Sequence, residues 1–163
     1  MGEELAKLPE AGFIRDIKHP DWLANLVMVP KKDKSWRLCV VFKDLNKACP
    51  KDPSPLPRND QIIDATAGHD SLCFLDAYSG YHQIKMEESD QAARAFITPY
   101  SPFCFNPMPF GPKNIGATYQ RMIQTCLEKH IGKTVEAYVE DVVIKTKPVV
   151  SLVDDLCLRF DNL

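Results

Sequence analysis

Four prolines within eight residues, at positions 50, 53, 55 and 57, constrain the fold of this chain more than any other feature. Proline fixes φ and has no backbone N–H, so this segment cannot enter a helix interior or a central strand. We expect an extended connector that acts as a hinge or as the boundary between two lobes. The alternative is a ligand for a domain that binds PxxP peptides.

The composition is that of a globular chain with one domain. Of the 163 residues, 45% are hydrophobic and 26% are charged, which excludes disorder and collagen-like fibres. The longest uncharged stretch runs from Ala95 up to Lys113 and contains five prolines, so it cannot form the apolar helix of about 20 residues that a bilayer requires. The N-terminus lacks the pattern of a secretion signal. We therefore expect no membrane partner and, by default, a cytoplasmic location.

The six cysteines are separated by ten residues or more, which excludes the close pairs of zinc sites. The four histidines are equally scattered, so a metal site built from histidine is not expected. Four of the cysteines lie in apolar runs, where a free thiol packs as a small hydrophobic group. We expect these four in the core: Cys39, Cys73, Cys104 and Cys126.

The formal net charge of −2 argues against a protein that coats nucleic acid, but the charge is unevenly distributed. Residues 31–51 hold seven Lys or Arg residues and only two Asp residues. This basic segment is suited to face phosphate groups. A solvated hairpin is the alternative.

Hydrophobic periodicity predicts strands and helices in irregular alternation. Expected strands are Gly12–Ile17, Leu26–Pro30, Trp36–Phe42, Ser71–Leu75, His82–Met86, Ala93–Thr98, Val135–Val139 and Val142–Ile144. Expected helices are Glu3–Leu8, a helix capped by Asn59 or Asp60 that ends at Thr66, Glu87–Gln91, a long helix capped by Asn114, and a terminal helix with Leu152, Leu156, Phe160 and Leu163 on one face. The many hairpins favour an α+β fold over a parallel doubly wound sheet.

Three acidic residues are candidates for a metal site. Asp76 ends an apolar run that we expect to be a strand buried on both faces, and Glu140 and Asp141 are expected to form the turn of a tight hairpin. If these strands are neighbours, the three carboxylates converge on one site. An all-oxygen set suits Mg²⁺ or Mn²⁺, and two such ions promote in-line phosphoryl transfer. Alternatively, Asp76 caps a turn and the other two acids are solvated.

Seven motifs follow one another in a fixed order along the chain. They are Gly12-Phe-Ile-Arg-Asp-Ile-Lys-His-Pro-Asp-Trp-Leu-Ala-Asn, Trp36-Arg-Leu-Cys-Val, Asp44-Leu-Asn-Lys-Ala-Cys-Pro-Lys-Asp, Phe74-Leu-Asp-Ala-Tyr-Ser-Gly-Tyr-His-Gln-Ile, Met108-Pro-Phe-Gly, Ala117-Thr-Tyr-Gln-Arg-Met and Tyr138-Val-Glu-Asp. Together they resemble the reverse transcriptase (RNA-directed DNA polymerase) of Gypsy-type LTR retrotransposons, from about Gly12 to Lys147 with a weaker continuation.

The resemblance implies a right-hand polymerase fold with an antiparallel palm sheet packed on helices. It places the fingers at roughly residues 1–51 and 84–110 and the palm at 52–83 and 111–163, as one partial domain without the thumb, connection and ribonuclease H. It also implies a retroelement particle as the location, an RNA or DNA template-primer and a dNTP as partners, and two Mg²⁺ or Mn²⁺ ions as cofactors. No oligomeric state is implied.

The resemblance also implies a role for each matching residue. It makes Asp76, Glu140 and Asp141 the catalytic metal ligands of nucleotidyl transfer from a dNTP to a primer 3′-OH. The residues implied to bind the dNTP are Lys32 and Arg37 at the triphosphate, Tyr81 as the gate that excludes a ribose 2′-OH, and Phe110 and Gly111 in the pocket lining. Those implied to lie near template and primer are Gln120, Arg121 and Tyr138.

The chain departs from the family pattern at the paired acids. Tyr138-Val139-Glu140-Asp141 stands where the family has Tyr-x-Asp-Asp, and glutamate adds about 1.5 Å of reach. A displacement of about 1 Å at a reacting centre can cost roughly 10²-fold in rate. Further departures occur at Val41, Pro112 and Ile115. The alternative is therefore a catalytically degenerate retroelement remnant that folds and at most binds nucleic acid weakly.

Overall fold

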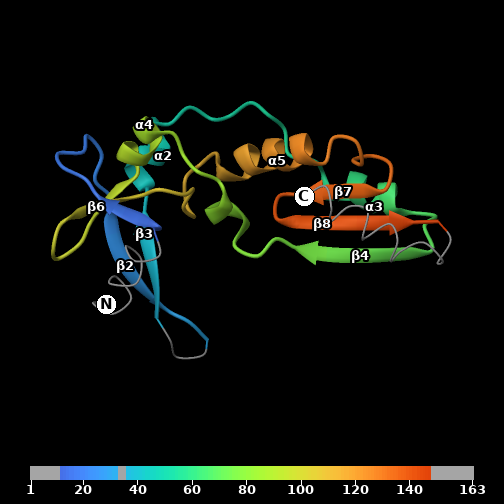
Figure 1. The fold of residues 1–163 in the computed structure, drawn as a ribbon, viewed down its shortest axis with the longest axis horizontal. Coiled ribbons are helices and arrows are strands. Elements are labelled where there is room, and N and C mark those ends of the chain that lie inside the picture. Colours follow the sequence, from blue (N-terminus) through green and yellow to red (C-terminus); the bar gives the residue numbers. More distant parts are fainter. Residues whose placement is uncertain (1–11, 33–35, 148–163) are drawn as a thin grey trace. The chain divides into compact units, whose positions relative to one another are not determined.

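The computed structural model describes residues 12–32 and 36–147, so the helices expected at Glu3–Leu8 and near the C-terminus lie outside the described residues. The chain divides into two compact units (Figure 1), Met1–Lys51 with Ser79–Ile115 and Asp52–Tyr78 with Gly116–Leu163. The first crossing between units falls inside the proline-rich connector. Residues 50–58 form neither helix nor strand, as expected. The assignment of fingers and palm stays a prediction.

The part of the first unit that the structure describes contains two antiparallel sheets. Strand β2 (Asn25–Pro30) pairs with β3 (Trp36–Val41) along its whole length, which confirms the expected basic hairpin. The other sheet has the order β1 (Ile14–Asp16), β6 (Pro102–Phe105), β5 (Ala95–Ile97). Strand β6 lies in the proline-studded run and is missing from the expected elements. It is possible there because Pro102 is the first residue of the strand, where a missing N–H is tolerated.

The core of this unit lies where the two sheets meet. Ile14 and Phe96 are its buried centre, with 3% and 0% of their surface exposed. Their half-buried neighbours come from both sheets, so the apolar face of the hairpin closes over the three-stranded sheet. These neighbours are Phe13, Ala24, Leu26, Leu38, Val40, Phe103 and Phe105.

In the described residues of the first unit there are also three short helices: α2 (Lys43–Ala48), the 3-10 helix η1 (Gly80–Gln83) and α4 (Glu88–Ala93). Helix α2 was not expected from the sequence. The strand expected at His82–Met86 is wrong, because Ser79 has a positive φ of 52° and starts η1 instead. Only Lys85 in that range pairs as an isolated bridge, to Pro107.

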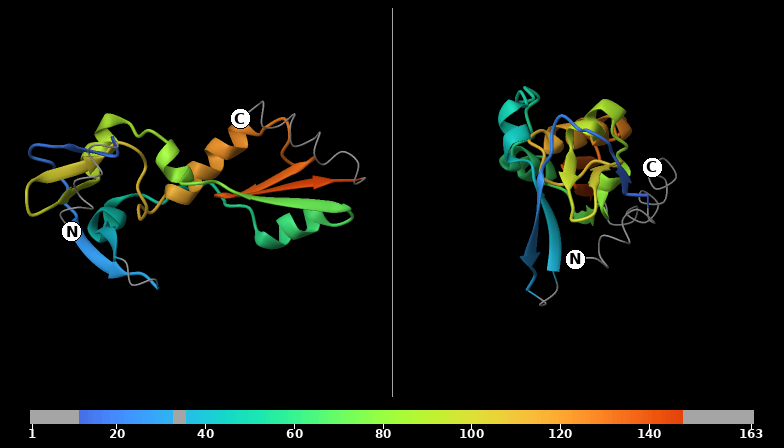
Figure 2. Two further views of the ribbon diagram at one scale, coloured as in Figure 1. Left: turned by 60° about the horizontal axis from the view of Figure 1, so that its bottom comes forward. Right: turned by 90° about the vertical axis from the view of Figure 1, so that its left-hand side faces the viewer.

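The second unit is an antiparallel sheet with the strand order β4 (Ser71–Asp76), β8 (Asp141–Thr146), β7 (Val135–Tyr138). Helices α3 (Asn59–Thr66) and α5 (Ile115–Cys126) lie beside this sheet (Figure 2, left), and α3 contacts β7. Because all sheets are antiparallel and mixed with helices, the α+β prediction is confirmed.

Helix α3 has the expected extent but not the expected cap. Its N-cap is Arg58, and the backbone N–H of Arg58 donates to Oε1 of Gln61 at 3.1 Å, as in a capping box. Gly68 follows its C-terminal end with a φ of +72°, as a helix stop requires.

Strand β4 is not buried on both faces, which corrects the prediction from its apolar run. Exposure alternates along the strand, and Phe74 is 73% exposed. Strand β4 is at an edge of its sheet, and a continuous apolar run alone cannot reveal how its faces are covered. The core position expected for Cys126 is also wrong, because this residue is exposed, whereas Cys104 is buried as expected and Cys39 and Cys73 are intermediate. No helix in the described part is long and apolar enough to cross a membrane.

Candidate functional site

Asp76 and Asp141 face each other across the β4–β8 ladder. They are partners in the register, and Asp141 is also the partner of Tyr138 in β7, so these three side chains share one row on one sheet face. The Cβ atoms of directly opposed residues are about 4.5–5.5 Å apart. Both aspartates are exposed. Folding therefore brings together two carboxylates that are 65 positions apart in the chain.

Glu140 lies in the two-residue turn that joins β7 to β8. The turn consists of Val139 and Glu140 rather than the expected Glu140 and Asp141, because Asp141 is already paired with Tyr138. The carbonyl of Glu140 accepts a hydrogen bond from the backbone N–H of Ala77 at 3.0 Å, which ties the turn to the end of β4. Among residues 12–32 and 36–147, no three His, Cys, Asp or Glu side chains are close enough to hold a metal ion.

The turn is strained and is held by Gln120 of α5. Val139 has a φ of +52°, which is rare and costly for a β-branched residue. The Gln120 side chain accepts from the backbone N–H of Val139 at 2.7 Å and donates to the carbonyl of Ala137 at 2.9 Å. Gln120 is 2% exposed. Its side chain therefore fixes the hairpin from inside, and the place near the template that the resemblance implies for Gln120 stays a prediction.

Tyr119 precedes Gln120 on α5 and is buried near the acidic residues. Burial raises the pKa of the Tyr119 phenol, and the negative charges of Glu140, Cys126 and Asp76 raise it further. The effect of these charges on the Tyr119 pKa indicates that α5 lies close to the end of the sheet that carries Asp76 and Glu140. Tyr119 was not among the predicted site residues, although it falls on the apolar stripe that predicted the helix.

Arg121 is engaged by the proline-rich connector. Its guanidinium forms an ion pair with Asp52 and donates to Oγ of Ser54 at 2.9 Å. The backbone N–H of Ser54 also donates to the Asp52 carboxylate at 2.9 Å. The hydrogen bonds from Ser54 and Arg121 lower the pKa of Asp52 to about 2. The connector is thus fastened to α5 by a charged group.

This lowered pKa predicts an acid-sensitive connector. Because the folded pKa of Asp52 lies below its usual value of 3.8, the stabilisation is complete above pH 4 and is lost as the pH falls towards 2. Urea unfolding of the parent and of Asp52→Asn, measured at pH 5, 3 and 2, should show a stability difference that shrinks at each step. A difference that stays constant over this range would show that the carboxylate is not held as described.

The residues implied to bind a dNTP lie in the first unit, in two groups. Lys32 and Arg37 line a depression of about 460 Å³ at the end of the β2–β3 hairpin. Tyr81 and Phe110 stack edge to face, with ring centroids 5.0 Å apart. Tyr81 is 8% exposed and Phe110 is 55% exposed, so the buried Tyr81 ring packs beneath the exposed Phe110 ring.

Gly111 is held in place by Asn46 of α2. The Asn46 side chain donates to the Gly111 carbonyl at 2.9 Å and accepts from the backbone N–H of Lys113 at 2.8 Å, so it brackets the loop. Asn46 was quoted within a motif but received no role. Neither this contact nor the one from Gln120 was predicted, because both join segments distant in sequence and give no periodic signal.

Gly111→Ala is expected to destabilise the first unit. Gly111 has a φ of +108°, and an added Cβ would lie 3.3 Å from the ring of the buried Phe42. The backbone strain alone costs about 1–2 kcal/mol. The matched control is Gly132→Ala, where φ is +76° but no atom lies within 4 Å of the added Cβ. In thermal unfolding Gly111→Ala should lower the midpoint more than Gly132→Ala, and equal shifts would contradict the predicted clash.

Comparison with known families and structures agrees with this architecture. The sequence model of the family described as reverse transcriptase (RNA-dependent DNA polymerase) matches residues 29–156. The Pol polyprotein of transposon opus from Drosophila melanogaster is 35% identical over 146 residues, which are 86% of this chain and 14% of that protein. The Tf2-3 polyprotein of Schizosaccharomyces pombe is 31% identical over 147 residues, which are 90% of this chain and 11% of that protein.

Solved structures share the fold. A foamy viral protease–reverse transcriptase in complex with an RNA/DNA hybrid superposes with a TM-score of 0.85 at 19% identity, covering 98% of this chain and 21% of that one. A second foamy viral structure, in complex with double-stranded DNA, gives a TM-score of 0.79 at 18% identity, covering 99% of this chain and 28% of that one. The expected polymerase fold is thereby confirmed. The chain spans less than a third of the length of these relatives and structures, and it belongs to the reverse transcriptase family of retrotransposon Pol polyproteins.

Proposed function

We propose that this chain forms the catalytic part of an RNA-directed DNA polymerase, which joins a dNTP to a primer 3′-OH on an RNA or DNA template. The pairing of Asp76 with Asp141 is the observation that carries the proposal. These are two positions of the acidic set that the family resemblance implies. Because the chain spans 14% of the opus polyprotein, the activity of the whole protein is part of the proposal.

The donor atoms at this position suit a hard divalent cation. Two like charges placed directly opposite on a sheet destabilise it, and a bound cation would remove this repulsion. Asp76 and Asp141 would then hold Mg²⁺ or Mn²⁺ through oxygen atoms alone, and Glu140, the third ligand that the resemblance implies, would join them only on binding. When bound, two such ions activate an attacking hydroxyl and stabilise the leaving oxygen.

The residues of the first unit would bind and orient the nucleotide. Arg37 can grip two phosphate oxygens at once, and Lys32 lines the same depression. The Tyr81 ring, which packs edge to face on Phe110, would exclude a ribose 2′-OH by its bulk. The foamy viral structures that contain an RNA/DNA hybrid or double-stranded DNA support a nucleic-acid template-primer as the partner.

A catalytically degenerate remnant is the second candidate. It is favoured by Glu140 at a family aspartate position and by the lack of a three-residue metal group in the described part of the chain. Primer extension on an RNA template with Mg²⁺ separates the two candidates when the parent is compared with Glu140→Asp and Asp76→Asn. Product from the parent that is lost in Asp76→Asn supports the polymerase. If only Glu140→Asp gives product, the degenerate remnant is supported. If neither the parent nor any variant gives product, this chain has no polymerase activity by itself.

A further inference from the structure

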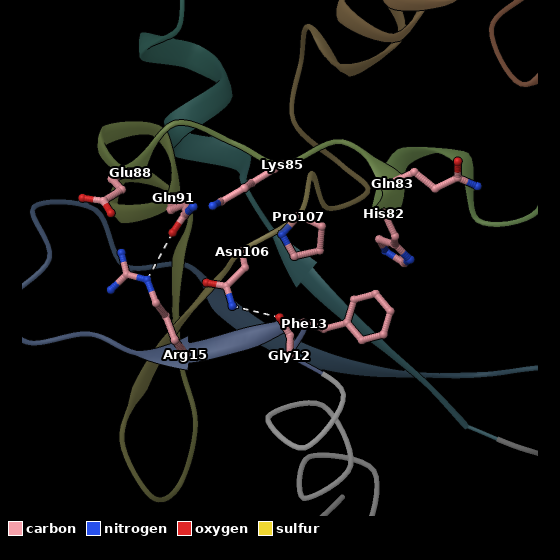
Figure 3. A pocket seen from close by; sticks show the side chains of 10 residues that line it. All are labelled: Gly12, Phe13, Arg15, His82, Gln83, Lys85, Glu88, Gln91, Asn106 and Pro107. Atoms are coloured by element: carbon pink, nitrogen blue, oxygen red, sulfur yellow. Dashed lines mark hydrogen bonds between the residues drawn. The ribbon is translucent and has the colours of Figure 1, made fainter. Parts of the chain in front are cut away.

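A pocket of about 660 Å³ lies in the first unit, and none of the predicted site residues lines it (Figure 3). Three stretches of the chain that are distant in sequence form its walls, at residues 12–15, 82–91 and 106–107. They contribute Gly12, Phe13 and Arg15, then His82, Gln83 and Lys85, then Glu88 and Gln91, and finally Asn106 and Pro107.

Hydrogen bonds fix these walls to one another. The backbone N–H of Asn106 donates to the carbonyl of Phe13 at 2.9 Å, and its side chain donates to the carbonyl of Gly12 at 2.8 Å. The segment around Lys85 is held to the same region, because Met86 donates its N–H to the carbonyl of Asn106 at 3.2 Å. The pocket is therefore preformed by main-chain contacts.

Gln91 orients the first of two cations in the pocket. Its side chain is buried, with 3% of the residue exposed, and donates to the carbonyl of Met86 at 2.9 Å. Its Oε1 accepts from Nε of Arg15 at 3.1 Å, as drawn in Figure 3. A guanidinium held through Nε keeps its terminal nitrogens available as a planar fork, the geometry that binds phosphate oxygens in pairs.

Lys85 supplies the second cation. Within the described ranges, neither its ammonium group nor the terminal nitrogens of Arg15 pair with a carboxylate within 4.0 Å, although Glu88 lines the same pocket. Figure 3 shows Lys85 and Arg15 approaching Gln91 from different walls. Two cations that have no carboxylate partner among the described residues, placed around one preformed pocket, are suited to bind an anion.

The remaining walls suit the rest of a nucleotide. Phe13 offers an aromatic ring, which stacks edge to face on His82 at 5.3 Å, and Pro107 offers an apolar surface. Bases stack on such rings without regard to sequence. The Glu88 carboxylate can accept hydrogen bonds from sugar hydroxyls.

We propose that this pocket binds a nucleoside phosphate, with the phosphate on Arg15 and Lys85 and the base against Phe13. The ligand is either a free nucleotide or one nucleotide of a single-stranded nucleic acid, since both present the same chemistry. The choice of a nucleotide rests on the proposed function, whereas the anion site rests on the pocket itself.

The test is an amide NMR titration of the full chain in EDTA with three probes: inorganic phosphate, adenosine 5′-monophosphate and a short single-stranded oligonucleotide. The monophosphate should shift the amide signals of Phe13, Lys85 and Asn106. Arg15→Gln and Lys85→Gln should each raise the Kd about tenfold or more, as expected for loss of a charge-assisted contact. Lys18→Gln, an exposed cation of the same unit outside the pocket, should leave the Kd unchanged.

The three probes also identify the source of the nucleotide. Tighter binding of the oligonucleotide than of the monophosphate assigns the pocket to a nucleic-acid strand, and the reverse order assigns it to a free nucleotide. If inorganic phosphate binds as tightly as the monophosphate, the proposal that the pocket recognises a nucleotide is wrong. The proposal that the ligand binds in this pocket is wrong if the shifts are confined to Lys32, Arg37 and Tyr81, or if the Kd is unchanged in Arg15→Gln. If a variant does not fold, the amide shifts of the parent chain still decide where the ligand binds.

The two proposals fail separately in these experiments. EDTA removes divalent cations, so an inactive site at Asp76 and Asp141 leaves the titration unaffected. Conversely, a pocket that binds no nucleotide leaves the primer-extension result unchanged.

Discussion

Gln120→Leu is expected to lower the free energy of unfolding by about 2–4 kcal/mol, because it leaves two backbone groups of the β7–β8 hairpin without partners. Leucine is similar in size, so the loss arises from the hydrogen bonds to Val139 and Ala137 rather than from a cavity. Urea unfolding followed by circular dichroism measures the change. We also expect loss of primer extension in any form of the protein that is active, since the strained turn next to Asp141 would relax.

Gln124→Leu is the matched control for this prediction. Gln124 lies one turn further along α5 and is exposed, so the change should stay within about 0.5 kcal/mol. If Gln120→Leu is as stable as Gln124→Leu, the side chain of Gln120 does not hold the hairpin. Gln120→Glu adds a second check, because a carboxylate can still accept from Val139 but cannot donate to Ala137.

Lys145→Ala is expected to have the largest effect on stability, a loss of about 3–5 kcal/mol. Lys145 is 3% exposed, and its ammonium group donates to the Glu136 carboxylate and to the carbonyl of Ala65 in α3, both at 2.7 Å. Removing it leaves the Glu136 side chain, which is 14% exposed, without a counter-charge. It also removes a contact that joins α3 to the sheet that carries Asp141.

The double variant Lys145→Met with Glu136→Leu distinguishes the effect of an unpaired charge from the effect of lost packing at these two positions. A buried ion pair replaced by apolar groups of similar volume is often neutral or stabilising. We therefore expect the double variant to recover most of the stability that Lys145→Ala loses. A double variant as unstable as Lys145→Ala would show that the packing at these positions, and not the unpaired charge, is responsible.

The sequence predicted the elements that have strong local signals. The basic hairpin was clear from two β-rich runs around a polar turn, and α5 from its apolar stripe. Asp76 was expected at the end of a strand, and the structure has it there. Its pairing with Asp141 was only conditional, because strand neighbours are set by folding and not by spacing.

The errors have physical causes. The turn was misplaced by one residue because two adjacent acids look like turn residues, whereas ladder pairing and Gln120 force the positive φ onto Val139. Strand β6 was hidden by its flanking prolines. The exposed face of β4 was missed because an apolar run carries no information on which face is covered.

Asp76 and Asp141 are proposed to share a divalent cation, and Mn²⁺ reports directly on this site. Substoichiometric Mn²⁺ should broaden the amide NMR signals of Asp76, Ala77 and Asp141 before any others, because the unpaired electrons relax only nearby nuclei, and excess Mg²⁺ should restore them. Asp76→Asn should abolish this local broadening, whereas Asp64→Asn, an exposed carboxylate on α3, should not. Broadening that is centred elsewhere, or that persists in Asp76→Asn, would show that these two aspartates do not share a cation.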